Sequence, residues 1–269
     1  TPISYEKAGF FMPASFSQVG MEAGVIHDML SAIRKGAYEN VHAVLLARSG
    51  RLVLEEYFHG HDRDQFHPIR SATKSIASVL MGIALDQGCF SSVEEPVYPY
   101  LKDRASHWDN RARAVTIQSI LTMTSGFDCD DHRGESFRCE KAMAGTDDWV
   151  DFAINLPMAH APGKHWAYNS ASLFLLNEVI ARTSGLSVPQ FADRYLLKPL
   201  GIHDFQWGSD PSGRAWLGGG ASMRPRDMVI FGQMCLEKGV WQGRRIVSEA
   251  WLSEATRCHA HSEYGQEYG

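Results

Sequence analysis

Ser71 and Lys74 are separated by two residues, at the start of an expected helix over residues 72–87. Residues three apart lie one above the other on a helix, so the Lys74 amine can reach the Ser71 hydroxyl. A neutral amine can take the serine proton, and the N–H groups of a helix start favour the alkoxide and the later oxyanion. The pair therefore predicts acyl transfer. Alone, the pattern is weak, because a capping serine followed by an exposed lysine looks the same.

Tyr168 adds a second reactive group, on a loop that leads into an expected helix over residues 171–183. A tyrosine hydroxyl held near a lysine can pass a proton to a leaving group. An isolated tyrosine is also common at the edge of a core, and Trp166 and Trp207 are open to the same two interpretations. They either line a cleft or pack in the core.

Several further segments occur in the order and spacing of a known family. They are Ile69-Arg70-Ser71-Ala72-Thr73-Lys74-Ser75, Ile120-Leu121-Thr122-Met123-Thr124-Ser125-Gly126, Pro162-Gly163 with Tyr168, Lys198-Pro199-Leu200-Gly201-Ile202, and Gly218-Gly219-Gly220 ahead of Pro225-Arg226-Asp227-Met228. With them the chain resembles the superfamily of β-lactamases and penicillin-binding proteins. Class C β-lactamases, DD-peptidases, family VIII esterases and nylon-oligomer (aminohexanoate-dimer) hydrolases are its nearest branches.

The resemblance implies a role for each reactive group: Ser71 is acylated, Lys74 deprotonates it, and Tyr168 carries the proton to the leaving group. Ser170 stands where many members have an asparagine that binds the substrate's side-chain amide. This departure favours small esters and linear amides as substrates, ahead of β-lactams and D-alanyl-D-alanine peptides.

Four more residues are expected to bind substrate beside Ser170. Asn169 and Trp166 flank Tyr168, and Gly219 and Gly220 belong to a glycine loop expected to line the cleft. No cofactor and no metal is predicted. The alternative of another class is a non-catalytic relative that uses the same cleft for binding.

The family also implies a Lys-Thr-Gly or His-x-Gly motif on a late strand, which would supply the second N–H of the oxyanion hole. No such motif lies between Tyr168 and Gly269. Residues 264–269 resemble the Tyr-Gly-x-x-Tyr-Gly stretch that normally enters that sheet. We therefore expect a chain truncated before its last strands and terminal helix, able to begin acylation but not to turn over. The alternative is a protein that evolved without these elements.

The order of elements predicts an α+β fold, with an antiparallel sheet flanked by helices and a helical subdomain. A helix over residues 25–37 precedes strands over residues 41–47 and 51–58, joined at Ser49-Gly50. The further expected helices span residues 116–123, 147–156, 188–197, 225–238 and 248–257. We expect a single domain over residues 1–269. Its parts are a sheet region (1–70), a helical region with the reactive groups (71–215) and a helical return toward the sheet (216–269).

The composition limits the classes of molecule that the chain is expected to bind. The chain is 44% hydrophobic and 21% charged with a net charge of −5, and it has no basic run suited to phosphates. No apolar stretch is long enough for a membrane span. The expected partner is therefore a small-molecule ester, amide or lactam, and not a nucleic acid. The compartment and the oligomeric state are left open.

Cysteines, histidines and acidic residues offer three weaker patterns. Five scattered cysteines favour free thiols, with a Cys129–Cys139 bridge as the alternative. The pairs His59/His61 and His259/His261 lack a third ligand at helical spacing and are expected to be surface histidines. Residues 128–131 contain three aspartates and are expected to form a solvated loop.

Overall fold

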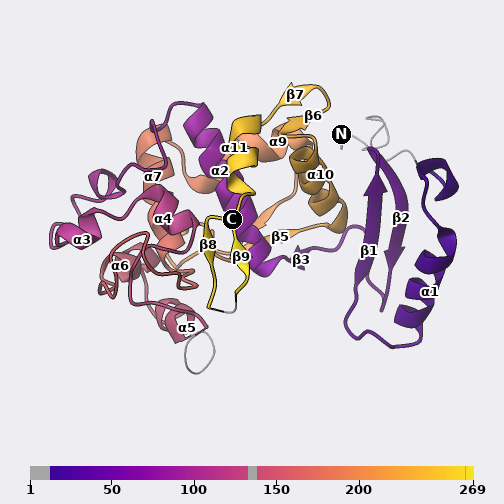
Figure 1. Cartoon of the computed structure of the whole chain (residues 1–269), viewed down its shortest axis with the longest axis horizontal. Coiled ribbons are helices and arrows are strands. Elements are labelled where there is room, and N and C mark those ends of the chain that lie inside the picture. Colours follow the sequence, from indigo (N-terminus) through magenta and orange to yellow (C-terminus); the bar gives the residue numbers. More distant parts are fainter. Residues whose placement is uncertain (1–12, 133–137, 264) are drawn as a thin grey trace.

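The computed structural model describes residues 13–132, 138–263 and 265–269. Its first part is a helix packed on a hairpin, α1 (Ala23–Arg34) against β1 (Ala43–Arg48) and β2 (Arg51–Tyr57) (Figure 1). Ser49 and Gly50 have φ angles of 51° and 69°, the left-handed values of a tight hairpin turn. Leu30 and Ile33 of α1 pack on Leu54 and Phe58 in a small core of their own.

The larger part of the chain surrounds the helix α2 (Thr73–Asp86), most of whose residues are buried. The helices around it are α3 (Asn110–Arg113), α4 (Ile117–Leu121), α5 (Arg138–Ala144), α6 (Trp149–Ile154), α7 (Leu175–Ser184), α8 (Val188–Ala192), α9 (Lys198–Leu200), α10 (Pro225–Leu236) and α11 (Glu249–Ala255). In Figure 1, α4 and α7 lie on one side of α2, and α10 lies on the other, toward the hairpin.

A short antiparallel sheet lies at the start of α2. Its strand order is β3 (His67–Pro68), β5 (Ala221–Met223) and β4 (Gln206–Trp207). His67 pairs with Met223, and the Ile69 N–H donates to the Ala221 carbonyl at 3.0 Å. The sheet therefore fixes the segment that enters α2 beside residues distant in the sequence.

Two further short hairpins lie late in the chain. They are β6 (Val240–Trp241) with β7 (Arg244–Arg245), and β8 (Ala260–His261) with β9 (Glu267–Tyr268). The second of these places Tyr268 next to the aromatic residues around Tyr168, as described below.

The predicted α+β class is confirmed, and the expected helices recur with shifted ends. The expectation that helix 188–197 stops before Pro199 is wrong. α8 continues through a π-helical segment, Asp193–Leu197, into α9. Pro199 stands in the first turn of α9, directly after the π-helical segment. Within the part of the chain that the structure describes, no helix is long and apolar enough to cross a membrane.

Candidate active site

Ser71 lies in a 3-10 turn, Arg70–Ala72, that leads directly into α2. Arg70 before it has a φ of 50°, a left-handed conformation that few side chains other than glycine adopt. Such backbone strain is held only where the surroundings determine it. Here the flanking contacts are the pairing of β3 with β5 and the Thr73 hydroxyl, which donates to the Arg70 carbonyl at 2.6 Å. The result is a Ser71 side chain presented at the exposed start of a long helix.

The Lys74 amine lies between Ser71 and Tyr168. Its Nζ is 3.3 Å from the Ser71 Oγ and 4.6 Å from the centroid of the Tyr168 ring. It also donates to the Gly218 carbonyl at 2.5 Å. The three groups singled out in the sequence are thus brought together from two distant segments, with a backbone carbonyl that orients the amine.

Gly218 is held where a side chain would not fit. A Cβ at this position would lie 2.7 Å from the Trp216 Nε1 and 3.0 Å from the Ser170 carbonyl oxygen. Gly220 is equally confined, since a Cβ there would lie 2.8 Å from the Gly208 carbonyl oxygen. The glycine loop is therefore a tightly packed segment that positions the Gly218 carbonyl. Neither Gly219 nor Gly220 lines the cavity beside Ser71 and Lys74.

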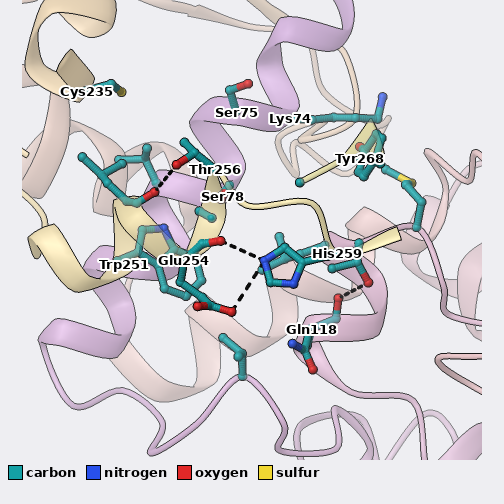
Figure 2. Close-up of a pocket in the computed structure, with 18 of the residues that line it drawn as sticks. Lys74, Ser75, Ser78, Gln118, Cys235, Trp251, Glu254, Thr256, His259 and Tyr268 are labelled. Atoms are coloured by element: carbon teal, nitrogen blue, oxygen red, sulfur yellow. Dashed lines mark hydrogen bonds and ion pairs between the residues drawn. The ribbon is translucent and has the colours of Figure 1, made fainter. Parts of the chain in front are cut away.

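A cavity of about 550 Å³ opens beside these groups. Ser71, Lys74 and Tyr168 line it together with side chains of α10 and α11. In Figure 2, Lys74 and Tyr268 lie on one side of the view, and Cys235 and Trp251 lie on the other. Its wall also includes Ser75, Leu121, Thr122, Met123, Tyr268 and Gly269, which belong to segments that carried the family resemblance. The remaining lining residues were not indicated by the sequence: Ser78, Val79, Val93, Gln118, Leu173, Phe231, Gly232, Cys235, Trp251, Leu252, Glu254, Ala255 and Thr256. A cavity of this size suits a small organic molecule.

Aromatic rings surround Tyr168 on several sides. The His132 ring stacks on it with centroids 4.5 Å apart, and the Trp166 centroid is 6.0 Å away. Tyr268 packs edge-on against Trp166 at 5.8 Å. Burial, and then the neighbouring Tyr168, raise the pKa of Tyr268. Trp166 is only 8% exposed and does not line the cavity, which favours the interpretation of core packing for this residue.

Asn169 and Ser170 lie behind the cavity wall. They are 1% and 2% exposed and do not line the described cavity. The Asn169 Oδ1 accepts a hydrogen bond from the Ser172 N–H at 2.9 Å, which shapes the turn into the next helix. The structure thus places both side chains in packing positions, and their expected contact with substrate is not supported by this arrangement.

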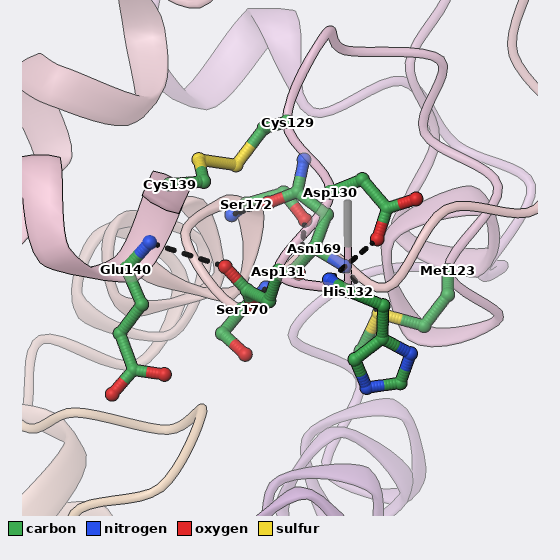
Figure 3. The surroundings of a disulfide bond; sticks show 10 residues. All are labelled: Met123, Cys129, Asp130, Asp131, His132, Cys139, Glu140, Asn169, Ser170 and Ser172. Atoms are coloured by element: carbon green, nitrogen blue, oxygen red, sulfur yellow. Dashed lines mark hydrogen bonds between the residues drawn. A yellow bond between two sulfur atoms is a disulfide. The ribbon is translucent and has the colours of Figure 1, made fainter. Parts of the chain in front are cut away.

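The aspartate segment differs from the expectation (Figure 3). Asp131 is 1% exposed, so the prediction of a solvated loop is wrong for this residue. Its carboxylate accepts from the Ser170 N–H at 3.0 Å and the Glu140 N–H at 3.1 Å, while its own N–H donates to the Tyr168 carbonyl at 2.8 Å. These bonds satisfy a buried carboxylate and fasten the backbone on both sides of Asn169.

The preference for free thiols is wrong for two of the five cysteines. Cys129 and Cys139 form a disulfide with their Cα atoms 5.6 Å apart, while Cys89, Cys235 and Cys258 are free. One disulfide and three free thiols account for the odd number of cysteines. The bridge joins the Asp131 segment to α5 (Figure 3).

Glu140, on α5, is an acidic group that the sequence did not indicate. Burial, followed by the charge of Asp131, raises the pKa of its carboxyl, against the opposing effects of Lys74 and Arg70. It therefore shares an electrostatic environment with the lysine. No local pattern could have revealed it, whereas Tyr268 belongs to the Tyr-Gly stretch that the family resemblance did single out.

One member of each histidine pair differs from the expectation of surface side chains, whereas His59 and His261 are exposed as expected. The His259 side chain is 13% exposed, lines the cavity and contacts the Glu254 carbonyl oxygen at 2.8 Å (Figure 2). His61 is half-buried and stacks on His42, with ring centroids 3.7 Å apart. His42 and His67, outside the pair, are the neighbours of His61 in the fold.

Comparison with known proteins places these features in a family. A family model described as Beta-lactamase matches residues 33–267. A 6-aminohexanoate-dimer hydrolase of Paenarthrobacter ureafaciens is 25% identical over 219 residues, which cover 78% of this chain and 55% of that protein. The chain thus spans about half the length of this curated relative.

Solved structures agree on the fold. An octameric penicillin-binding protein homologue from Pyrococcus abyssi has a TM-score of 0.70 at 19% identity, covering 93% of this chain and 64% of its own. A family VIII carboxylesterase has a TM-score of 0.70 at 18% identity, covering 90% and 78%. The resemblance inferred from the sequence is confirmed. Because the family model extends over most of its residues, this chain belongs to the β-lactamase family, whose members are hydrolases that generally depend on a serine.

Proposed function

We propose that this protein is a serine hydrolase that cleaves small esters or linear amides through an acyl-enzyme on Ser71. The observation that carries the proposal is the position of the Lys74 Nζ, 3.3 Å from the Ser71 Oγ and 4.6 Å from the Tyr168 ring centroid. A nucleophile, a base and a proton carrier meet at one end of a cavity, which is the minimum that acyl transfer requires.

In the first half-reaction, a neutral Lys74 amine takes the Ser71 proton while the Oγ attacks the carbonyl carbon of the substrate. The carbonyl π electrons move to its oxygen, and the Ser71 N–H at the start of α2 helps to stabilise the oxyanion. When the tetrahedral intermediate collapses, the bond to the leaving group breaks. The proton held by Lys74 passes through the Tyr168 hydroxyl to the departing alcohol or amine.

In the second half-reaction, a water molecule attacks the acyl carbon of the Ser71 ester. Its proton is taken by the same Lys74 and Tyr168 groups, and collapse returns a proton to the Ser71 Oγ. The carboxylic acid product then leaves. The Gly218 carbonyl keeps the amine within reach in both steps, because it fixes one of its hydrogen bonds at 2.5 Å.

The substrate class is proposed from the cavity and from Ser170. Hydrophobic side chains such as Val93, Leu121 and Phe231 line the cavity, which suits an apolar acyl or alcohol part. The shorter Ser170 stands where many lactamases have the asparagine that binds a side-chain amide, and it is buried. Both points favour esters and linear amides over β-lactams. The names of an aminohexanoate-dimer hydrolase and a carboxylesterase among the similar proteins are consistent with this choice.

A fluorophosphonate probe tests the nucleophile directly. The protein, expressed from its complete gene, should be labelled at Ser71, and Ser71→Ala should abolish labelling. Ser75→Ala is the matched control, since Ser75 lines the same cavity one turn further along α2 and should leave labelling intact. Undiminished labelling of Ser71→Ala would remove the proposal.

Hydrolysis of a short nitrophenyl ester then tests the base and the substrate class. Lys74→Ala should lose this activity, with folding checked by circular dichroism. The same preparation should cleave the ester faster than a chromogenic cephalosporin. A reversed preference would assign the site to β-lactams, and binding without turnover of either substrate would favour a non-catalytic relative.

A further inference from the structure

Three histidines from separate segments meet at one end of the hairpin. His42 directly precedes β1, His61 follows β2, and His67 is the first residue of β3. The His42 and His61 rings are stacked at 3.7 Å with an angle of 16° between them. The His67 ring lies 5.3 Å from the first and 5.4 Å from the second. We call these residues the histidine cluster.

The backbone fixes this arrangement. The Phe58 N–H donates to the His42 carbonyl at 2.9 Å, which aligns the two strands at that end of the hairpin. The His61 N–H donates to the Phe58 carbonyl at 3.0 Å, so the chain turns back over the hairpin immediately after β2. The pairing of His67 with Met223 holds the third residue in the sheet at the start of α2.

The hydrogen bonding of His67 determines which of its nitrogens is free. Its Nδ1 lies 3.2 Å from the Gln65 carbonyl oxygen. A carbonyl oxygen only accepts, so Nδ1 carries the proton and the lone pair of the neutral ring is on Nε2. That Nε2 is buried and has no hydrogen-bond partner among the residues that the structure describes. A backbone carbonyl on one nitrogen and an unused lone pair on the other is the arrangement that orients a metal-binding imidazole.

His61 presents a second unsatisfied nitrogen. Its Nδ1 is also buried without a partner in the described parts of the chain. Leaving a buried polar atom unpaired is unfavourable, so two such atoms in one cluster favour a ligand between them. One ring nitrogen from each of the three histidines lies within 4.8 Å of the others.

We propose that His42, His61 and His67 bind one divalent transition-metal ion of the Zn²⁺ class, with an open coordination position for water. Three neutral imidazoles suit zinc, copper and nickel better than magnesium or calcium, which prefer oxygen ligands. Zn–N bonds are about 2.0–2.1 Å long, so the rings must draw together and the stacked pair must tilt apart for their lone pairs to converge. All three residues are half-buried and none belongs to the core, so their side chains have room to adjust.

The proposed ion would join the hairpin to the segment that enters the candidate active site. β3 continues through Ile69 and Arg70 into Ser71, and Arg70 holds a left-handed conformation. A metal bound at His67 would therefore reduce the motion of the chain just before the proposed nucleophile. The metal proposal does not depend on the proposed function, since its test measures binding rather than activity.

Two other residue sets must be separated from this site in any experiment. Cys258, His261 and Glu267 also lie close together, but all three are exposed. Cys129, Asp131 and Cys139 are close as well, yet both thiols are consumed by the disulfide. The first set therefore needs its own control variant.

The test uses protein without a histidine tag, stripped with a chelator, incubated with Zn²⁺ and dialysed against metal-free buffer. Zinc per chain is measured by mass spectrometry, and affinity by competition with a chromogenic chelator. The unaltered chain should retain one zinc ion, as should His59→Gln, an exposed neighbour outside the cluster, and Cys258→Ala. His61→Asn and His67→Gln should each weaken binding at least as much as the roughly 10–100-fold caused by losing an outer partner of a metal ligand.

Two results would overturn the proposal. The unaltered chain could retain no zinc, or His61→Asn and His67→Gln could each retain as much zinc as the unaltered chain. If a variant fails to fold, the Co²⁺-substituted unaltered chain decides. Intense visible bands of four- or five-coordinate cobalt with nitrogen ligands would support the site. The weak spectrum of hydrated Co²⁺ would exclude it.

Discussion

The Thr73 hydroxyl accepts a hydrogen bond from the Ala221 N–H at 3.2 Å, which ties the start of α2 to β5. Thr73 is completely buried, and the same hydroxyl donates to the Arg70 carbonyl at 2.6 Å. One side chain between Ser71 and Lys74 thus fixes both the turn that presents the serine and the strand that follows the Gly218 carbonyl. Thr73, at a variable position of the Ser-x-x-Lys pattern, therefore contributes to the geometry of the candidate site.

Replacement of Thr73 by valine tests this link. Thr73→Val keeps the shape of the side chain but leaves the Ala221 N–H buried and unpaired, which should cost about 1–3 kcal/mol of unfolding free energy. Ester hydrolysis should fall as well, because the Lys74 and Gly218 contact loses its support. Thr73→Ser keeps the hydroxyl and should lose only about 0.8 kcal/mol for one buried methyl group. Urea titration measures the unfolding free energy of both variants. A Thr73→Val protein as stable as the parent would contradict a stabilising role for the hydrogen bond between Thr73 and Ala221.

The two tyrosines near the cavity should behave differently. Tyr168 has the Lys74 amine at 4.6 Å from its ring centroid, whereas Tyr268 packs against Trp166. If Tyr168 carries the proton, Tyr168→Phe should lower kcat by about 10²–10⁴-fold. Tyr268→Phe should retain kcat within about tenfold and change mainly KM, since its hydroxyl takes no part in the proposed proton path. Equal losses of kcat in the two variants would assign the proton path to another group.

Much of the site could be predicted from the sequence because its signals are local. Ser71 and Lys74 are three residues apart on a helix with a clear apolar pattern, and Tyr168 stands at the entrance of another. Helix geometry alone brings Ser71 and Lys74 together, whereas the contact of Lys74 with Tyr168 depends on the fold and was expected only from the family resemblance. The hairpin was predictable for the same reason, since Ser49 and Gly50 favour the turn that they form.

Features that depend on tertiary contact were not predictable. The acidic neighbours of Asp131 suggest a solvent-exposed side chain. In the fold it is buried and accepts a hydrogen bond from the Ser170 N–H, which is far along the chain. β3 and β4 have two residues each and carry no alternating pattern. The histidine cluster likewise forms only when three separate segments meet, so each pair viewed alone resembled surface residues.

The disulfide is open to a chemical test. In denaturant without reduction, alkylation should modify three cysteines, Cys89, Cys235 and Cys258, and a reductant should make Cys129 and Cys139 reactive as well. Closing a loop of about ten residues contributes about 2–4 kcal/mol to stability, so reduction should lower Tm by several degrees.

The double variant Cys129→Ala/Cys139→Ala should match the reduced parent in Tm, and Cys89→Ala serves as the control for loss of a free thiol. Activity should also fall in the double variant, because the bridge holds the segment in which Asp131 binds the Ser170 N–H. Five alkylated cysteines in the untreated protein would show that the bridge is absent.

The ion pair of Glu55 and Arg226 joins the hairpin to α10 and should make stability depend on acid pH. Two Arg226 nitrogens donate to the Glu55 carboxylate at 2.8 and 2.5 Å, and the two side chains are only 14% and 17% exposed. Burial raises the pKa of Glu55, but hydrogen bonds from Arg226 and Tyr57 and the charge of Arg226 outweigh burial, so the net pKa is lowered. A lowered pKa means that the folded chain holds the ionised form more strongly than the unfolded chain does.

The stabilisation is therefore fully present above the ordinary value of 4.5 and is lost as pH falls through the lower folded value. Glu55→Gln should remove that part of the acid dependence and cost about 1.5–3 kcal/mol at neutral pH, where a charged hydrogen bond is lost. Tyr57→Phe, which removes the hydroxyl that donates to Glu55 at 2.6 Å, should reduce the acid dependence only partly. Urea unfolding from pH 7 to pH 3 measures all three proteins. Parallel stability curves for the parent and Glu55→Gln would contradict the predicted acid dependence, and superimposable curves would show that the pair does not stabilise the docking of the hairpin.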